Sequence, residues 1–264
     1  MSLRTLACAV VVMACGAGGA ARAQDSFSDA FWEYRAYAGF DYSSGHYGAT
    51  DVTEVYYASA TLRASKGPWA FKAVVPWLRV SGPAVLLDGA SSGTVTTNAT
   101  SRHESGAGDI GLYGTYSIQS LYQHGLFIDL TARVKAPTAS FSKGLGTGKA
   151  DAAFQVDIAK SLGKFMPLAT VGYRLTGSPA GYDLRNIAYG TVGLQYNWSS
   201  RIVTGALFDY RQSALRTAEN PKELTGYVNV KIGEKWSLNV YGVAGFSRNS
   251  PDHGGGLVIS YRWP

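Results

Sequence analysis

The chain has two cysteines among its 264 residues, Cys8 and Cys15, and both lie near its start. Beyond its first 23 residues it also lacks any run of 18 apolar residues, and its mean hydropathy is −0.04 although 46% of its residues are apolar. The missing apolar run excludes a transmembrane helix. The missing cysteines exclude a disulfide framework and a cysteine-based metal site in the rest of the chain.

The first residues are typical of a secretory signal peptide. Arg4 precedes the apolar stretch Leu6–Ala14, and Ala21-Arg22-Ala23 supplies an A-x-A cleavage site. We therefore expect residues 1–23 to be removed and residues 24–264 to form a single domain. The alternative interpretation takes residues 12–15 as a lipidation site at Cys15, a pattern that Met13 fits poorly.

Charge says little about partners. Without Arg4 and Arg22 the chain holds 22 basic and 18 acidic residues, a net charge of +4. No basic cluster with interleaved aromatic residues stands out, so we expect no nucleic-acid partner. A mild positive excess suits a protein that lies among anionic headgroups, and we expect outer-membrane lipid and lipopolysaccharide as its surroundings.

From Trp32 to Trp263 the chain repeats stretches of about ten residues in which apolar and polar residues alternate. In Leu126–Lys135 the even positions are all apolar, and the odd positions are Phe, Asp, Thr, Arg and Lys. This period of two indicates strands with one side in lipid and the other in a polar interior. We predict twelve strands, at residues 31–42, 52–65, 69–80, 107–119, 126–136, 150–161, 167–176, 187–198, 202–212, 222–232, 236–246 and 254–263.

The predicted connectors are alternately short and long. Short periplasmic turns and long extracellular loops are typical of outer-membrane barrels, and an even strand count places both ends of the chain in the periplasm. Closure also leaves no exposed strand edge. The predicted fold is a closed antiparallel up-and-down transmembrane β-barrel of about twelve strands, in the outer membrane of a Gram-negative bacterium.

The aromatic residues are sorted along the strands. Five of the six tryptophans fall at one predicted rim: Trp32, Trp69, Trp198, Trp236 and Trp263. Four further aromatic residues fall toward the opposite rim: Tyr42, Trp77, Tyr210 and Phe246. Aromatic girdles at both membrane interfaces are typical of transmembrane barrels. A soluble β-sandwich, the alternative fold, gives no reason to sort tryptophans to one end.

Two segments resemble a known outer-membrane family. Ser105–Ile118 begins with a G-x-G-D element, and Arg133–Asp151 contains V-K-x-P-T followed by G-T-G-x-x-D. These elements are similar to those of the barrel family named after the meta-pathway of phenol degradation, and Val171–Pro179 resembles its next element. The resemblance implies transport of small, often aromatic or hydrophobic, compounds.

The alternation places most charged strand residues on the inward face. Lysine or arginine facing lipid at mid-membrane costs about 2–4 kcal/mol, which supports this assignment. Two interpretations stay open: a hydrated pore whose charges sort a small solute, and an interior filled by its own ion pairs. The residues are Glu33, Arg35, Arg63, Asp109, Asp129, Arg133, Lys135, Asp157, Arg174, Asp209, Arg211, Glu223, Lys231 and Arg262.

Catalysis is disfavoured by the placement of the four histidines. His46, His103, His124 and His253 all fall in predicted connectors. Hydrolytic sites pair a histidine with a serine or a carboxylate, and we find no such pair on one strand face. We therefore predict no enzyme activity, no metal and no cofactor, although His46, His103 and His253 could meet at the outer rim.

The segment 81–106 contains an apolar patch, Val85-Leu86-Leu87, among glycine, serine and threonine. Either it folds into the mouth of the barrel and captures hydrophobic solutes, or it belongs to a mobile surface loop, which its composition favours.

Taken together, these features predict a monomeric passive channel for a small solute. The residues from Gln24 to Ala30 are too few for a plug or an energy-coupling domain. The alternation that the barrel assembly machinery reads is present up to Trp263, although Pro264 follows the usual terminal aromatic residue. The alternatives are a non-conducting anchor or receptor barrel and, less favoured, a hydrolase acting at the rim.

Overall fold

The computed structural model describes residues 31–86, 94–96, 102–179, 181 and 183–263. The predicted signal peptide, with Cys8 and Cys15, lies outside the described residues, as do Leu87 and Pro264. Within the described part of the chain, no helix is both long and apolar enough to cross a membrane.

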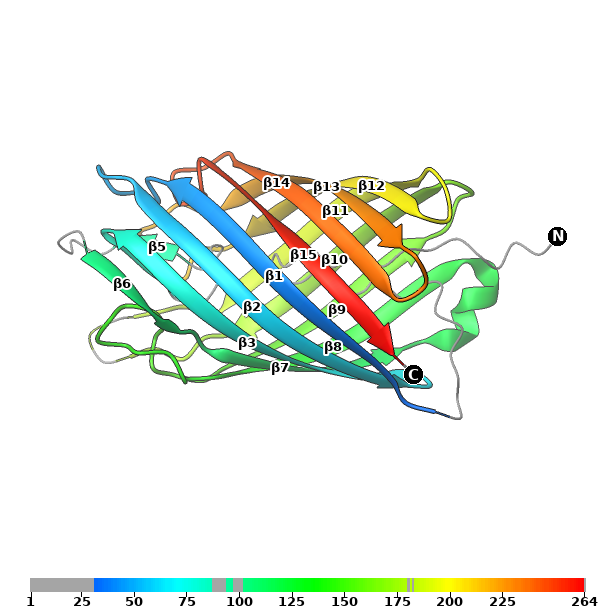
Figure 1. Cartoon of the computed structure of the whole chain (residues 1–264). Coiled ribbons are helices and arrows are strands. Elements are labelled where there is room, and N and C mark those ends of the chain that lie inside the picture. Colours follow the sequence, from blue (N-terminus) through cyan, green and yellow to red (C-terminus); the bar gives the residue numbers. More distant parts are fainter. Residues whose placement is uncertain (1–30, 87–93, 97–101, 180, 182, 264) are drawn as a thin grey trace.

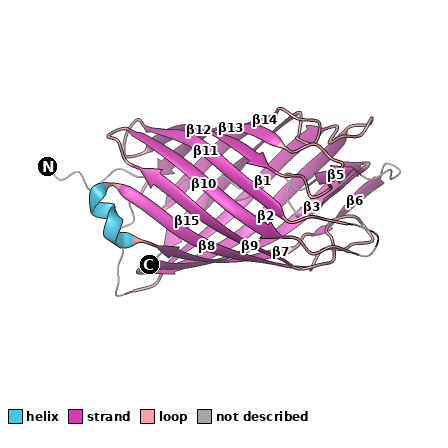
Figure 2. Ribbon diagram, turned by 180° about the vertical axis from the view of Figure 1, so that it is seen from behind, coloured by secondary structure: helices cyan, strands magenta, loops and turns pink. Residues whose placement is uncertain are grey.

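Twelve long antiparallel strands form a closed barrel (Figure 1, Figure 2). Neighbours in the chain are neighbours in the sheet, and the first and last strands pair along their whole length, from Tyr34 opposite Trp263 to Ser44 opposite His253. The predicted closed twelve-stranded barrel is therefore confirmed. The strands are β1 (Glu33–Gly45), β2 (Thr53–Lys66), β3 (Trp69–Gly82), β6 with β7 (Arg102–Ala107 and Ile110–Ser117), β8 (Leu126–Ala136), β9 (Asp151–Lys160), β10 (Phe165–Leu175), β11 (Ile187–Asn197), β12 (Ile202–Arg211), β13 (Lys222–Ile232), β14 (Trp236–Gly245) and β15 (His253–Trp263).

The fourth strand is longer than predicted and is interrupted by a bulge. β6 and β7 both pair with β3, but the register shifts between them: Ala107 lies opposite Trp77, whereas Gly111 lies opposite Val74. One extra residue is therefore accommodated beside Pro76, which has no N–H to offer the ladder. The Pro76 carbonyl accepts a hydrogen bond from the Gly108 N–H at 2.9 Å.

The predicted connector 81–106 is consequently wrong in part. It contains β6 and a small hairpin of β4 (Ala84–Leu86) and β5 (Thr94–Thr96). β6 was not predicted because its residues, RHESGA, carry little apolar alternation. His253, predicted to lie in a connector, is the first residue of β15.

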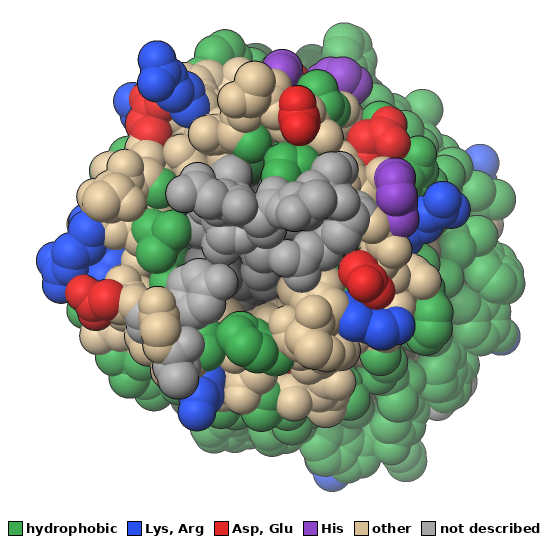
Figure 3. All heavy atoms as spheres, turned by 90° about the vertical axis from the view of Figure 1, so that its left-hand side faces the viewer, with side chains coloured by type: hydrophobic (Ala, Val, Ile, Leu, Met, Phe, Trp, Pro, Cys, Tyr) green, Lys and Arg blue, Asp and Glu red, His purple; other side chains and the backbone are tan. Residues whose placement is uncertain are grey.

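The two ends of the barrel differ in their connectors. Short turns join β2 to β3, β9 to β10, β11 to β12 and β13 to β14, and the 3₁₀ helix Gln119–His124 joins β7 to β8. The long connectors all lie at the other end, which Figure 3 views from outside. We call these the short-turn end and the long-loop end. Charged and histidine side chains ring the long-loop end, while hydrophobic side chains cover the flank of the barrel (Figure 3).

The strands are amphipathic as the alternation requires. Large apolar side chains remain exposed on the outer face, including Leu62, Phe154, Val171 and Val192. The residues between them along the same strands are buried, and many of these are polar or charged. An apolar exterior around a polar interior suits a lipid environment and has no rationale in water.

The five predicted rim tryptophans lie at strand ends beside the short turns. Ring contacts join aromatic residues around this end, with centroid separations of 4.9 Å for Trp69–Tyr116, 4.8 Å for Trp236–Tyr261 and 4.7 Å for Tyr196–Trp198. Trp263 stacks on Tyr34 at 6.0 Å, and Trp32 lies 6.4 Å from Phe71. The outer surface therefore carries a band of aromatic clusters, the aromatic band, at the short-turn end.

Candidate functional site

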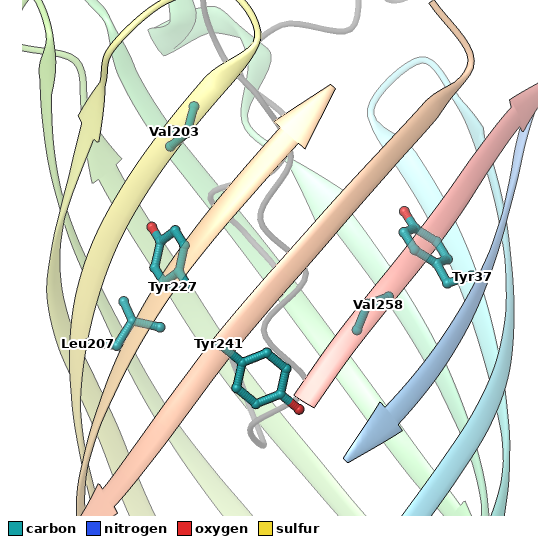
Figure 4. Close-up of a cluster of buried hydrophobic side chains, with 6 residues drawn as sticks. All are labelled: Tyr37, Val203, Leu207, Tyr227, Tyr241 and Val258. Carbon is teal, nitrogen blue, oxygen red and sulfur yellow. The ribbon is translucent and has the colours of Figure 1, made fainter. Parts of the chain in front are cut away.

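The inner surface of the barrel has two walls of different chemistry. The first, which we call the charged wall, comprises the inner faces of β3 and β7 to β11; its charged side chains include Lys72, Asp129, Arg133, Lys135, Asp157 and Arg174. The second, which we call the tyrosine wall, comprises the inner faces of β12 to β15 and β1; its charged side chains, among them Arg35, Asp41, Arg211 and Glu223, lie toward its two ends. It holds one apolar cluster of Tyr37, Val203, Leu207, Tyr227, Tyr241 and Val258 (Figure 4). The order of the strands places the two walls on opposite sides of the lumen.

On the charged wall, two cations flank one aromatic ring. The Lys72 Nζ lies 4.0 Å from the centroid of the Tyr113 ring, and the Arg133 Cζ lies 5.4 Å from it. Both distances lie within the range of cation–π attraction. The Tyr113 ring therefore positions two positive charges on the inner face of the charged wall.

The carboxylate of Asp157 on the same wall is well supplied with donors. It accepts hydrogen bonds from the Thr170 hydroxyl at 2.6 Å and from the Gln155 amide at 2.8 and 3.0 Å. The Gln155 carbonyl in turn accepts a hydrogen bond from the Tyr189 hydroxyl at 3.2 Å. Hydrogen bonds to an ionised acceptor are the stronger kind, so this network fixes the wall in one arrangement.

The motif residues that carried the family resemblance converge in space. Lys135 of V-K-x-P-T lies with its Nζ 2.8 Å from Asp109 of G-x-G-D and 3.1 Å from Asp151 of G-T-G-x-x-D. The same Nζ donates to the Thr147 hydroxyl at 3.2 Å. The side chains of Lys135 and Asp109 are 1% and 0% exposed, so neither can touch a solute. This buried triad ties the bulge, β8 and the start of β9 into one unit.

The triad also draws the connector between β8 and β9 into the barrel. The Ala139 N–H donates to Asp109 at 2.8 Å, and the Thr138 hydroxyl donates to the Gly108 carbonyl at 2.8 Å. A Cβ on Gly146 would stand 2.8 Å from Asp109, so only glycine permits this approach. Leu145 is fully buried in a cluster with side chains of β2 and β3. The predicted extracellular loop 137–149 therefore folds inward.

A second connector, between β1 and β2, also carries a buried side chain. Tyr47, between β1 and β2, is fully buried and donates a hydrogen bond to the Ser43 hydroxyl at 2.8 Å. Burial raises the pKa of the Tyr47 phenol above its usual value, which keeps the hydroxyl protonated and able to donate. The Tyr47 carbonyl accepts from the Asn249 amide at 3.5 Å. The long-loop end is thus narrowed by residues of its own connectors.

The remaining predicted residues fall into two groups along the inner face. At the short-turn end, Glu33 lies 3.5 Å from Arg35 and 3.8 Å from Arg262, and Arg63 lies opposite Arg35 in the sheet. Toward the long-loop end, Arg211 and Glu223 form an ion pair at 2.6 Å, and Asp209 accepts from Thr191 at 2.5 Å. Lys231 is half-buried beside Ser237, apart from both groups.

The predicted inner-face residues were chosen by charge alone, so several uncharged inner-face residues and one lysine were not among them. The prediction did not include Tyr37, Tyr227 and Tyr241, whose alternation with outward apolar residues was available as a signal. It also did not include Lys72, although the outward run of Trp69, Phe71 and Ala73 placed that lysine inward. The burial of Lys135 by loop 137–149 had no signal in the strand pattern.

The structure brings two histidines next to hydrogen-bonding partners. The His103 Nδ1 lies 2.6 Å from the Ser81 hydroxyl, on the neighbouring strand, and the His46 Nδ1 lies 2.9 Å from Asp252. The Ser81–His103 pair joins two neighbouring strands, and the strand pattern did not predict it because β6 was read as a loop. Among the described residues there is no group of three histidine, cysteine or acidic side chains that could hold a metal ion.

The fold is that of an outer-membrane type of β-barrel. Its features are an apolar outer face, a polar inner face, closure without a free strand edge, and connectors that are alternately short and long. The most informative likeness is to an outer membrane channel from Pseudomonas putida F1, with a TM-score of 0.63, 14% identity and coverage of 88% of this chain and 95% of that chain. The NanC porin gives 0.55 at 8% identity, covering 86% and 98%, and the KdgM porin, solved with disordered oligogalacturonate, gives 0.53 at 8%, covering 86% and 99%. The sequence matches no protein-family model and no curated protein. The likeness to these structures establishes the fold.

Proposed function

We propose that the protein is a passive channel for small solutes in the outer membrane of a Gram-negative bacterium. The observation that carries the proposal is the lumen with two chemically distinct walls inside an apolar, lipid-facing exterior. A barrel that served only as an anchor would need the exterior but not a charged wall facing a tyrosine wall. The aromatic band at the short-turn end suits the periplasmic interface, which leaves the long loops outside the cell.

The proposed solute is a small compound with an apolar or aromatic body. Apolar surface on the tyrosine wall offers contact to such a body, and the paired cations beside Tyr113 offer a partner to an anionic group. The similar structures support passage of solutes through barrels of this fold, because one is an outer membrane channel and two are porins. The family resemblance in Ser105–Ile118 and Arg133–Asp151 points to the same class of compound.

Single-channel conductance tests the proposal. We expect the mature protein, purified from outer membranes and inserted into a planar bilayer, to give discrete current steps, and we expect benzoate to reduce the current. Heat-modifiable mobility on a gel verifies that the sample is folded. Folded protein that gave no current steps would contradict the proposal and favour a structural or receptor barrel.

A further inference from the structure

We call a row of residues that lie opposite one another on neighbouring strands a rung. One rung of the tyrosine wall carries two amide side chains in apolar surroundings. Asn229 of β13 and Asn239 of β14 lie opposite each other, with Val203 of β12 beside the first and Val258 of β15 beside the second. Asn229 is 3% exposed and Asn239 is 2% exposed. Two buried amides therefore interrupt the apolar cluster at adjacent positions.

Three polar atoms of these two amides have no hydrogen-bond partner in the part of the chain that the structure describes. Among the described residues, no group hydrogen-bonds to the Nδ2 or the Oδ1 of Asn239, or to the Oδ1 of Asn229. A buried polar atom without a partner costs about 1–3 kcal/mol, so a wall shaped only for stability would carry apolar residues here. The pair offers donors and acceptors side by side, and a hydroxyl group, which is both donor and acceptor, matches that arrangement.

The next rung offers two flat aromatic surfaces. Tyr227 lies opposite Tyr241, directly beside the asparagine rung. Each ring lies across a glycine of the neighbouring strand: a Cβ on Gly205 would overlap the Tyr227 ring, and a Cβ on Gly256 would stand 2.7 Å from the Tyr241 hydroxyl. Because glycine leaves room there, the rings lie against the wall instead of across the lumen (Figure 4).

A carboxylate borders the same rung. Asp41 of β1 lies opposite Gly256, and its Oδ1 would stand 2.8 Å from a Cβ at that glycine, beside the Tyr241 hydroxyl. Asp41 is 8% exposed, and its Oδ2 has no hydrogen-bond partner among the residues that the structure describes. This group would accept a hydrogen bond from a hydroxyl donor.

We propose that Asn229, Asn239, Tyr227, Tyr241 and Asp41 form a binding subsite for a neutral ring that carries two or more hydroxyl groups. The face of the ring lies on the tyrosines, and its hydroxyls complete the hydrogen bonds that the amides and the carboxylate lack. Sugars and dihydroxybenzenes share this chemistry. The subsite rests on the proposed passage of solutes, since a ligand reaches it only through the lumen.

The test compares binding with conductance in the same preparation. Calorimetric titration of the folded wild-type protein in detergent uses glucose, catechol and benzoate, and current block is recorded with the same compounds. We expect glucose or catechol to bind, and the double variant Asn229→Leu/Asn239→Leu to bind about tenfold more weakly, as expected for the loss of hydrogen bonds worth about 1.4 kcal/mol. The variant Thr115→Val, on the charged wall, is the matched control and should bind as the wild type does.

The outcomes separate this subsite from the channel function. Binding that depends on the asparagines, in a protein without current steps, would retain the subsite and reject the channel. Current steps without any binding of glucose or catechol, or with equal binding by the double variant, would retain the channel and overturn the subsite, leaving water as the partner of the amides. If glucose binds more tightly than catechol, the natural ligand is a sugar; if catechol binds more tightly, it is a dihydroxybenzene.

Discussion

The charged wall and the tyrosine wall differ in how the buried polar side chains on their inner faces are hydrogen-bonded. On the charged wall the carboxylate of Asp157 has several donors, and Lys135 has two carboxylates and a hydroxyl. On the tyrosine wall the Oδ1 of Asn229 and both polar atoms of the Asn239 amide have no such partner among the described residues. In our proposal, Asp157 and Lys135 are completed by the protein, whereas these amide atoms are completed by a ligand that enters the lumen.

The largest effect in this comparison is expected at the buried triad. Replacing Lys135 with methionine keeps most of its volume but leaves Asp109 and Asp151 as unpaired buried carboxylates. Breaking a buried ion pair in this way costs about 3–5 kcal/mol, which denaturant unfolding in detergent would measure. The matched control is Lys143→Met: Lys143 is 50% exposed and 3.9 Å from Glu104, so its loss should cost at most about 1 kcal/mol. Equal costs for the two variants would show that the triad does not stabilise the charged wall.

A smaller effect is expected where a tyrosine lies across a glycine. Gly205→Ala would drive the Tyr227 ring from its place, and overpacking of this kind costs about 1–3 kcal/mol. Gly226→Ala is the control, because a Cβ there meets nothing within 4 Å. Both variants can be ranked by thermal unfolding in the same detergent. If Gly205→Ala were as stable as the control, the flat position of the ring would not depend on the glycine.

The smallest effect concerns ion selectivity. Arg133→Gln combined with Arg174→Gln removes two positive charges from the charged wall, and we expect the preference for anions over cations to fall. A charge at 4 Å in water is worth about 1 kcal/mol, so the permeability ratio should change several-fold at most. Reversal potentials in a salt gradient measure this ratio. Arg79→Gln, on the outer face, should leave the ratio unchanged, and a ratio that survives the double variant would reject the assignment of these arginines.

The strand alternation predicts Lys135 on the inward face together with Arg133 and Arg174, and the structure separates Lys135 from these arginines. The Lys135 side chain is 1% exposed, whereas Arg133 is half-buried beside Tyr113. Lys135 is therefore expected to affect stability and not selectivity. The two kinds of inward charge cannot be told apart from strand alternation, because alternation gives the side of a sheet but not what covers it.

The barrel fold could be predicted from the sequence because its pattern is local and is repeated in every strand. Each strand reveals its lipid side by a period of two, and the connectors reveal the two ends by their length. The pattern failed where local rules are broken. β6 has few apolar residues to alternate, and the bulge at Gly108 follows from Pro76, which lies more than thirty residues earlier in the chain. The inward fold of loop 137–149 depends on Asp109, which no rule of spacing connects with Ala139.

Only the charged residues of the candidate site were predicted from the sequence. The alternation identifies every inward residue, but the prediction chose among them by charge, and many of those charged side chains are paired with other groups of the protein. The alternation also places the asparagines and tyrosines of the tyrosine wall inward, but nothing in the sequence distinguishes them from other inward residues. The asparagines stand out only because some of their polar atoms have no hydrogen-bond partner in the folded structure, and the sequence pattern cannot show this.

The pairing of β1 with β15 has a consequence for how the molecule forms. These strands join residues as far apart as Tyr34 and Trp263, so their contact requires nearly the whole chain to be ordered first. At the long-loop half of this seam β15 contributes Gly254, Gly255 and Gly256, which have no side chains to interlock with β1. Closure at these three positions depends mainly on main-chain hydrogen bonds, with side-chain contacts at the outer edge between Tyr42 and His253 and between His46 and Asp252. Loss of either terminal strand would therefore leave two unpaired edges in lipid, and the barrel should form as a complete ring or not at all.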